Sequence, residues 1–258
     1  MMETPLISIV MPVFNSARTL RESVESVKAQ TWREWELLLV DDCSSDASRE
    51  LIAEFVASDV RIRSLLLATN QGAALARNEG VRSASGRYIA FLDSDDLWVP
   101  AKLELQMASL QEHSAGLVFS DYEWIDLHGH PLGVVVRAPD RPDWKRLSWG
   151  NDIGLSSVLV DRSAIGDPIM LPLRLNHDFA LWMEYLRKGA VAVRCPGSLV
   201  KYRVISGSLS QNKLESLRTN WQILHHLQGV GVFHTTLRLM AWAVRTTLRR
   251  LVRLVGSK

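Results

Sequence analysis

Phe91-Leu92-Asp93-Ser94-Asp95-Asp96-Leu97-Trp98 places three carboxylates directly after the short apolar run from Tyr88 to Leu92. Such a run predicts a buried strand, and the ligand crevice of an open α/β sheet lies at the carboxyl ends of its strands. We therefore expect Asp93 and Asp95 to project into a crevice. Carboxylate oxygens suit Mg²⁺ or Mn²⁺, which proteins often share with nucleotide phosphates. An acidic turn that only caps the next helix is an equally open alternative.

On both sides of this motif, from Leu6 to about Trp124, short apolar runs alternate with segments of helical periodicity. This alternation is typical of βαβ units, and nearly unbroken apolar strands indicate a parallel sheet with helices on both faces. The sequence thus predicts an α/β fold with a mostly parallel, Rossmann-like sheet. The expected strands are Ile7 to Val13, Glu36 to Val40, Ile62 to Leu67, Tyr88 to Leu92 and Leu117 to Ser120.

Composition describes a globular protein with an ordinary core. The chain has 258 residues, of which 47% are hydrophobic and 22% charged, and its net charge of +2 argues against a dedicated nucleic-acid binder. Cys43 and Cys195 have no metal-ligand spacing, so we interpret them as reduced thiols of a cytosolic protein. No basic segment or cleavage site typical of an export signal precedes the first strand.

Three parts are expected along the chain. Residues 1–125 form a nucleotide-binding half, residues 126–228 form an acceptor-side half, and residues 229–258 form a basic amphipathic helix. In the middle part the pattern is weaker, with helical pieces at Trp144 to Trp149 and at Asp178 to Lys188.

Polar residues also follow the first two predicted strands, in Pro12-Val13-Phe14-Asn15 and in Asp41-Asp42. Neighbouring strand ends would frame a pocket in which Phe14 offers an apolar face and an aspartate accepts from a base or a ribose. Taken alone, Asp41 and Asp42 are more typical of turn and cap residues. Next along the chain, Asn70-Gln71-Gly72 opens a helix whose amides, together with Arg77, could meet a diphosphate.

Together these segments resemble glycosyltransferase family 2, whose members have the GT-A fold, over about residues 5–228. By this resemblance, Phe14 and Asp42 contact the nucleotide base, Asp93 the ribose or sugar, and Asp95 a metal ion that bridges the diphosphate, with Asp93 or Asp96 as further ligands. The matching segments, which supply the remaining expected donor-site residues, are Pro12 to Asn15, Asp41-Asp42, Asn70 with Gly72, Ala76-Arg77-Asn78, Gly86 to Ile89 and Asp93-Ser94-Asp95-Asp96.

The later segment from Asn176 to Trp182 resembles the family's acidic motif, and Asp178 occupies the position of its catalytic base. The chain departs from a common form of the family, because His177 stands where that form has glutamate. A histidine that some relatives carry further on is replaced by Ile205. Arg203 and Ser208 remain candidates for phosphate contacts, although Arg203 could equally be a surface residue.

The resemblance implies an inverting, metal-dependent transfer in which Asp178 deprotonates an acceptor hydroxyl. The donor would be a nucleoside-diphosphate sugar, favoured as UDP-linked, and the acceptor a glycan or polyprenyl-diphosphate-linked hydroxyl of envelope polysaccharide biosynthesis. The segment from His177 to Lys213 is most similar to teichuronic acid type transferases. Two alternatives remain: a sugar nucleotidyltransferase, although Pro12 to Arg18 lacks its glycine-rich basic loop, and a non-catalytic nucleotide-sugar-binding protein.

The C-terminal helix is predicted to be amphipathic and basic. Beyond Gly229 the chain has five arginines besides Lys258 and no acidic residue. Each arginine near a bilayer centre costs about 2.5–3.5 kcal/mol, which argues against a membrane span. An in-plane helix instead gains about 1 kcal/mol per basic residue on an anionic surface. We therefore expect a cytoplasmic protein bound peripherally to the inner face of the membrane, with packing against the domain as the alternative.

Overall fold

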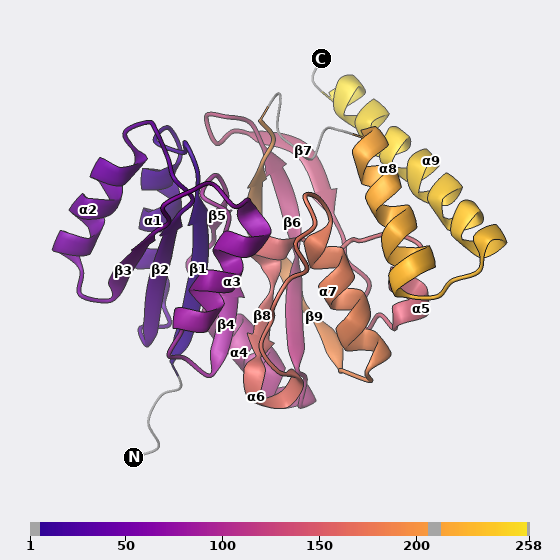
Figure 1. Cartoon of the computed structure of the whole chain (residues 1–258), viewed down its shortest axis with the longest axis horizontal. Coiled ribbons are helices and arrows are strands. Elements are labelled where there is room, and N and C mark those ends of the chain that lie inside the picture. Colours follow the sequence, from indigo (N-terminus) through magenta and orange to yellow (C-terminus); the bar gives the residue numbers. More distant parts are fainter. Residues whose placement is uncertain (1–5, 206–212, 257–258) are drawn as a thin grey trace.

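The computed structural model describes residues 6–205 and 213–256, with side chains described to residue 244 of the last helix. In this part of the chain, nine strands form one sheet in the order β3-β2-β1-β4-β8-β6-β9-β5, and β7 pairs with β6 (Figure 1). The strands are β1 (Ile7–Val13), β2 (Trp35–Asp41), β3 (Ile62–Leu66), β4 (Tyr88–Phe91), β5 (Leu97–Trp98), β6 (Leu117–Ile125), β7 (Pro131–Val136), β8 (Leu159–Asp161) and β9 (Ala192–Arg203).

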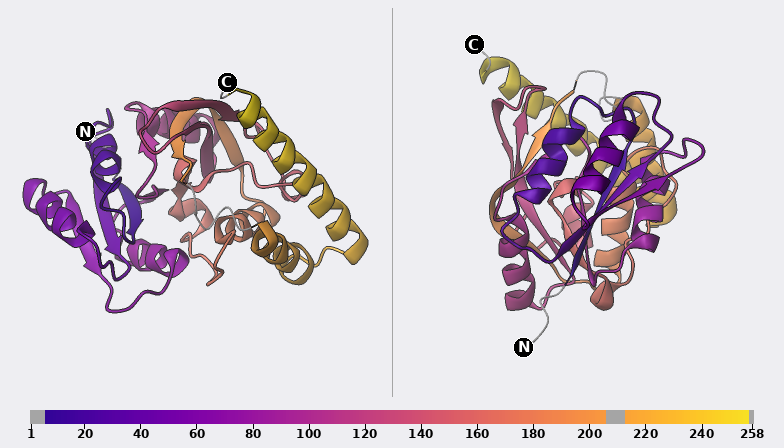
Figure 2. Two further views of the ribbon diagram at one scale, coloured as in Figure 1. Left: turned by 90° about the horizontal axis from the view of Figure 1, so that it is seen from above. Right: turned by 90° about the vertical axis from the view of Figure 1, so that its left-hand side faces the viewer.

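Helices and shorter helical turns connect these strands, and helices cover both faces of the sheet (Figure 2). They are α1 (Leu20–Lys28), α2 (Ser48–Ser58), α3 (Ala73–Ser83), α4 (Lys102–His113), α5 (Trp144–Leu147), the 3₁₀ turn η1 (Leu155–Ser157), α6 (Arg162–Ile165), α7 (His177–Arg187), α8 (Lys213–Trp221), the π-helical segment η3 (Gln222–Leu227) and α9 (Val232–Gly256).

The five strands expected from the sequence are present, with ends within a few residues of the prediction except that β6 runs on to Ile125. β1, β2, β3 and β4 are mutually parallel, as predicted. Beyond β4 the sheet is mixed, because β8 pairs antiparallel with both β4 and β6, while β6 and β9 are parallel. The two predicted halves of the chain therefore contribute strands to one continuous sheet.

Two buried clusters of apolar side chains lie on opposite faces of this sheet. Successive residues of a strand point to opposite faces. Accordingly, Val10 packs in the cluster beneath α3 and α7, while Ile9 and Met11 pack in the cluster beneath α1, α2 and α4. Gly80 of α3 lies so close to β1 that an added Cβ would stand 2.4 Å from Cγ1 of Val10. Helix α3, which precedes β4 and the Asp93–Asp96 segment, is thus held tightly against β1.

The last helices lie at the end of the molecule opposite α2 (Figures 1 and 2). No helix within residues 6–205 or 213–256 is both long enough and apolar enough to cross a membrane. Cys43 and Cys195 are free thiols, in agreement with the sequence-based expectation.

Candidate functional site

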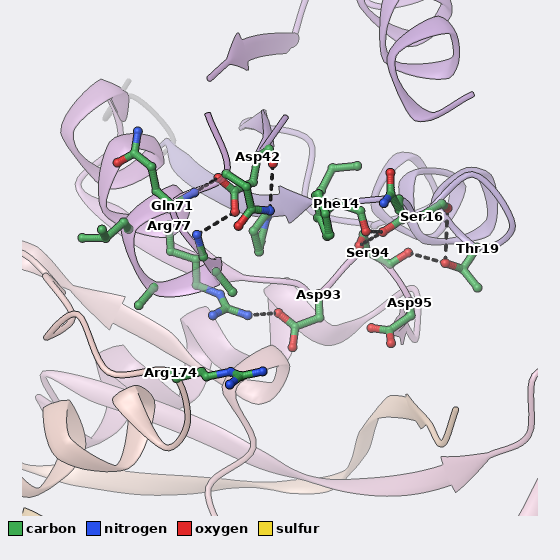
Figure 3. Close-up of a pocket in the computed structure, with 18 of the residues that line it drawn as sticks. Phe14, Ser16, Thr19, Asp42, Gln71, Arg77, Asp93, Ser94, Asp95 and Arg174 are labelled. Atoms are coloured by element: carbon green, nitrogen blue, oxygen red, sulfur yellow. Dashed lines mark hydrogen bonds and ion pairs between the residues drawn. The ribbon is translucent and has the colours of Figure 1, made fainter. Parts of the chain in front are cut away.

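Asp93, Ser94, Asp95 and Asp96 form the loop after β4, called the acidic loop. This loop lies where the strand order reverses, since β4 continues the sheet on the side of β1 opposite β2. Ligand crevices of open α/β sheets form at such a switch point, outside the carboxyl ends of the strands. A cavity of about 940 Å³ occupies this place. Its lining combines the ends of β1 and β2, the turn before α3, the acidic loop and the segment before α7 (Figure 3).

One wall of the cavity is organised by Asp42. Its carboxylate accepts hydrogen bonds from the backbone amides of Gln71, at 2.7 Å, and Gly72, at 2.8 Å, and its carbonyl accepts one from Asn70 at 3.1 Å. Gly72 has a φ of +89°, a conformation that favours glycine. Phe14 lies near Asp42 (Figure 3) and is 50% exposed, so its ring is free to stack against a planar ligand.

Asp41 and Asp42 have different surroundings, although the sequence predicted both as pocket residues. Asp41 is fully buried and outside the cavity lining, where it accepts a hydrogen bond of 2.6 Å from Nε of Arg49. Asn15 does line the cavity, and so does Pro12. The side chain of Asn15 also accepts a hydrogen bond of 2.8 Å from the Ser45 amide, which joins the loops after β1 and β2.

The acidic loop brings three carboxylates together. One oxygen from each of Asp93, Asp95 and Asp96 lies within 4.8 Å of the others. Asp93 and Asp95 line the cavity with Ser94, whereas Asp96 is buried beneath them. Hard oxygen donors at this spacing fit Mg²⁺ or Mn²⁺.

Burial and mutual repulsion shape the protonation of these groups. Burial raises the pKa of Asp95 to about 6, and the neighbouring charge of Asp93 adds to the increase. Burial also raises the pKa of Asp96 well above its usual value, with further contributions from Asp95 and Asp93. Burial and mutual repulsion disfavour the fully ionised form of these carboxylates. A cation bound between them would stabilise that form.

Ser156 of η1 anchors the acidic loop by hydrogen bonds, although no sequence pattern indicated this role. Its hydroxyl donates to Asp96 at 2.6 Å and accepts from the backbone amide of Asp93 at 3.1 Å. Its carbonyl accepts a hydrogen bond of 2.8 Å from the indole of Trp98. One residue therefore fixes both ends of the loop.

Arg203 supports the same loop from the other side. Its amide donates to Asp96 at 3.0 Å and its Nε to the carbonyl of Asp95 at 2.7 Å, while the rest of the guanidinium contacts the Leu127 carbonyl and Glu22. With only 2% exposure it is not a surface residue, so that alternative is wrong. Its guanidinium is turned to the loop rather than to the cavity lining. Ser208 lies outside the described residues, and Ile205 lines the cavity.

Arg77 joins the acidic loop to α7. Its guanidinium forms an ion pair with Asp93 and a hydrogen bond of 2.6 Å with Nε2 of His177. Burial, reinforced by the charge of Arg77, lowers the pKa of His177 to about 3, so the imidazole is neutral. With Nδ1 of His177 3.3 Å from the Leu173 carbonyl, the network assigns the proton to Nδ1 and leaves Nε2 to accept from Arg77.

Asp178 begins α7 next to this link. Its carboxylate accepts a hydrogen bond of 3.0 Å from Asn151, and burial raises its pKa, while the Phe179 amide and the charge of Arg77 act in the opposite direction. Asp178 is not part of the cavity lining itself. It is within electrostatic range of Asp93 and Arg77, which do line the cavity, so it stands at the margin of the same site.

Comparison with known proteins identifies the family. Residues 8–147 match the model of Glycosyl transferase family 2. The chain is 33% identical over 247 residues, 96% of its length and 98% of the relative, to TuaG of Bacillus subtilis, which is named for teichuronic acid biosynthesis. It is 38% identical over 86% of its length and 87% of the relative to WfgD of Escherichia coli, a UDP-Glc:α-D-GlcNAc-diphosphoundecaprenol β-1,3-glucosyltransferase.

Solved structures agree on the fold. Residues 1–349 of TarS from S. aureus, in complex with UDP-GlcNAc, align with a TM-score of 0.70 over 90% of this chain and 70% of that one, at 17% identity. The mannosyltransferase PcManGT of Pyrobaculum calidifontis, in complex with GDP-Man and Mn²⁺, aligns with a TM-score of 0.69 over 99% of this chain and 76% of that one, at 15% identity. The expected GT-A fold is confirmed, and the chain is a glycosyltransferase that belongs to family 2.

Proposed function

We propose that this glycosyltransferase is metal-dependent and inverting, and that it moves a sugar from a UDP-sugar to a hydroxyl of a lipid-linked envelope glycan. The observation that carries the proposal is the link from Asp93 through Arg77 to His177, which holds the acidic loop and the start of α7 together. It keeps the carboxylates that suit a cation close to the start of α7, which carries Asp178. A sugar nucleotidyltransferase has no such support, because the matching family model is that of glycosyl transferases.

The donor is proposed to lie with its base against Phe14 and Asp42. The exposed ring of Phe14 and the ordered turn Asn70–Gly72 support this orientation, since a flat base needs a stacking surface and fixed polar neighbours. UDP is favoured because WfgD uses UDP-Glc and TarS was solved with UDP-GlcNAc. The acceptor class follows from WfgD, whose acceptor is a sugar carried on diphosphoundecaprenol.

Asp95 and Asp93 are the residues proposed to hold Mg²⁺ or Mn²⁺, with Asp96 beneath them. Such an ion would neutralise charge that develops on the leaving diphosphate. Arg77 keeps Asp93 oriented, while Ser156 and Arg203 fix the loop. We propose that Arg203 positions the loop in this way and does not contact phosphate.

Asp178 is proposed to accept the proton of the attacking acceptor hydroxyl. The hydrogen bond from Asn151 orients its carboxylate, and a pKa raised by burial makes that carboxylate a stronger base. The hydroxyl oxygen then bonds to the anomeric carbon on the face opposite the departing nucleoside diphosphate, so the configuration inverts.

Asp178→Asn tests this role. General-base catalysis contributes about 100- to 10,000-fold, so kcat should fall by that order while the affinity for UDP with Mn²⁺ stays unchanged. The amide keeps an oxygen that can accept from Asn151, which limits structural damage. Unchanged turnover of the Asp178→Asn variant would remove Asp178 from the base role.

We further propose that α9 binds an anionic membrane surface. In its described part, Phe233, Leu237, Met240 and Val244 are 75%, 44%, 61% and 61% exposed, and their spacing places them on one helical face. Arg238 packs inward instead, with its guanidinium 5.6 Å from the ring centre of Trp149. An apolar face turned to solvent in a segment rich in arginine suits a lipid surface better than water. The arginines from Arg245 onward lie outside the described side chains.

A further inference from the structure

We infer that Arg174 forms an anion-binding site on the acceptor side of the cavity, and that its ligand is the diphosphate that carries the acceptor glycan. This inference rests on the proposed function, because it gives the lipid-linked acceptor a specific contact. Arg174 had no role in the sequence-based expectations. The cavity is lined on this side by Pro172, Leu173 and Arg174, the segment just before α7.

Arg174 extends into the cavity from the wall that faces the nucleotide side. Figure 3 shows its guanidinium below Asp93, whereas Asp42 and Gln71 lie on the other side of Asp93. Its side chain is 69% exposed. Arg77 in the same cavity is 5% exposed and already bound to Asp93 and His177, so it has much less freedom to meet a new ligand.

The segment that carries Arg174 is anchored at both ends. Asn78 of α3 exchanges two hydrogen bonds of 2.8 Å with the backbone N–H and C=O of Met170. At the other end, Asn176 donates a hydrogen bond of 2.8 Å to Asn220 of α8. A fixed backbone under an exposed guanidinium lowers the entropy lost when a ligand is bound.

The charge around Arg174 leaves capacity for an anion. Its ion pair with Glu215 of α8 spans 3.5 Å, longer than a strong charge-assisted hydrogen bond, and 27% of the Glu215 side chain is exposed. The planar guanidinium offers several donors in a geometry that matches phosphate oxygens. A diphosphate could therefore take up donors that Glu215 leaves available.

Position along the chain assigns this site to the acceptor rather than the donor. Arg174 and Asp178 are four positions apart in the chain, so their Cα atoms lie within about 14 Å of each other. An acceptor whose hydroxyl meets Asp178 places its next group about one sugar ring away, and in a sugar diphosphate lipid that group is the diphosphate. The donor diphosphate belongs instead at Asp93 and Asp95.

The test measures binding of farnesyl diphosphate to the full chain, saturated with UDP and Mn²⁺, by titration calorimetry. Arg174→Gln should weaken this binding by about tenfold, the usual effect of losing a hydrogen bond to a charged group, and leave the affinity for UDP unchanged. Glu215→Gln should strengthen farnesyl diphosphate binding, because it removes the competing carboxylate. Arg82→Gln, which breaks the exposed ion pair with Glu79 on α3, is the matched control and should change neither affinity.

Loss of UDP affinity in Arg174→Gln would overturn the inference by moving Arg174 to the donor side. Unchanged farnesyl diphosphate binding in Arg174→Gln, or no binding to the wild-type protein, would overturn it as well. Thermal unfolding shows whether each variant is folded. The readout is binding, so a failure of the proposed transfer reaction, seen as absent turnover with a sugar diphosphate lipid, is distinguished from a failure of this site.

Discussion

His177 shows how this chain accommodates a residue that differs from a common form of its family. The neutral imidazole accepts a hydrogen bond from Arg77 and so keeps α7 attached to the acidic loop without adding a charge to a buried site. A glutamate in this place would instead form an ion pair with Arg77. The contact thus depends on the acceptor atom rather than on the charge.

The buried imidazole makes stability depend on pH. A histidine in an unfolded chain has a pKa of about 6.5, whereas the pKa of His177 in the folded protein is about 3. Between about pH 6.5 and about pH 3, the unfolded state therefore binds a proton that the folded state does not. As the pH is lowered through this range, the free energy of unfolding falls by about 1.4 kcal/mol for each pH unit.

His177→Gln should remove this dependence while keeping an acceptor for Arg77. Urea unfolding at about pH 7 and about pH 5 should show that the wild-type protein loses about 2 kcal/mol more than the variant between these conditions. The effects of Asp95, Asp96 and Asp178 are common to both proteins and cancel in this difference. Parallel pH profiles would contradict a buried neutral His177.

The sequence indicates which residue types gather at the site but not how each side chain is oriented. Asp41 and Asp42 are adjacent, and consecutive residues at a strand end point to opposite sides, so Asp42 lines the cavity while Asp41 pairs with Arg49. A one-residue uncertainty in the strand end was enough to leave both as candidates. Ser156 and Asn151 were missed because their partners lie 60 and 27 residues away, and no periodicity connects them.

The 3₁₀ turn η1 has only three residues, yet it anchors the acidic loop. Ser156 bonds to Asp96 and to the Asp93 amide, whereas the hydroxyl of its neighbour Ser157 bonds only locally, to the Gly154 carbonyl at 2.7 Å, among the bonds described for it. Substitution of Ser156 should therefore affect both the acidic loop and stability, whereas substitution of Ser157 should affect stability alone.

Ser156→Ala should cost about 1–3 kcal/mol of stability, because buried Asp96 loses a donor, and it should also raise the Mn²⁺ concentration needed for half-maximal transfer. Ser157→Ala should lower stability by a comparable amount without changing the Mn²⁺ requirement. Chemical denaturation and metal titration of the transfer rate measure the two effects. An unchanged Mn²⁺ requirement in Ser156→Ala would mean that η1 only stabilises the fold.

The strands β5, β8 and β9 were missed for two physical reasons. β8 has three residues and β5 has two, which is too short for a periodic signal. β9 includes Pro196 and Gly197, and its register against β6 shifts between Ser120 and Tyr122. Such an interruption breaks the alternation by which a strand is recognised. The first four parallel strands were predicted because burial on both faces makes them almost wholly apolar.

For the whole molecule, α9 carries the proposed membrane contact. The double variant Phe233→Asp with Met240→Asp should lose flotation with vesicles rich in phosphatidylglycerol, since both side chains belong to the exposed apolar face. Val60→Asp changes an apolar residue that is 98% exposed between α2 and β3, at the opposite end of the molecule, and should float like the wild type.

Flotation of the double variant with the same vesicles would contradict membrane binding through α9. Loss of a dimer in the double variant, seen by light scattering without lipid, would instead assign the apolar face to a second copy of the chain. On another side of α9, Arg238 packs inward on Trp149 and Thr235 is buried, so the face that carries Phe233 and Met240 is the one turned to solvent.

The most direct test of the proposed chemistry is the affinity for UDP, measured by titration calorimetry with and without Mn²⁺, in the wild-type protein and in Asp95→Asn. If Asp95 holds an ion against the diphosphate, Mn²⁺ should strengthen UDP binding by about tenfold or more in the wild type and by much less in the variant. An equal gain from Mn²⁺ in both proteins, or no gain in the wild type, would contradict the metal site on which the proposed mechanism depends.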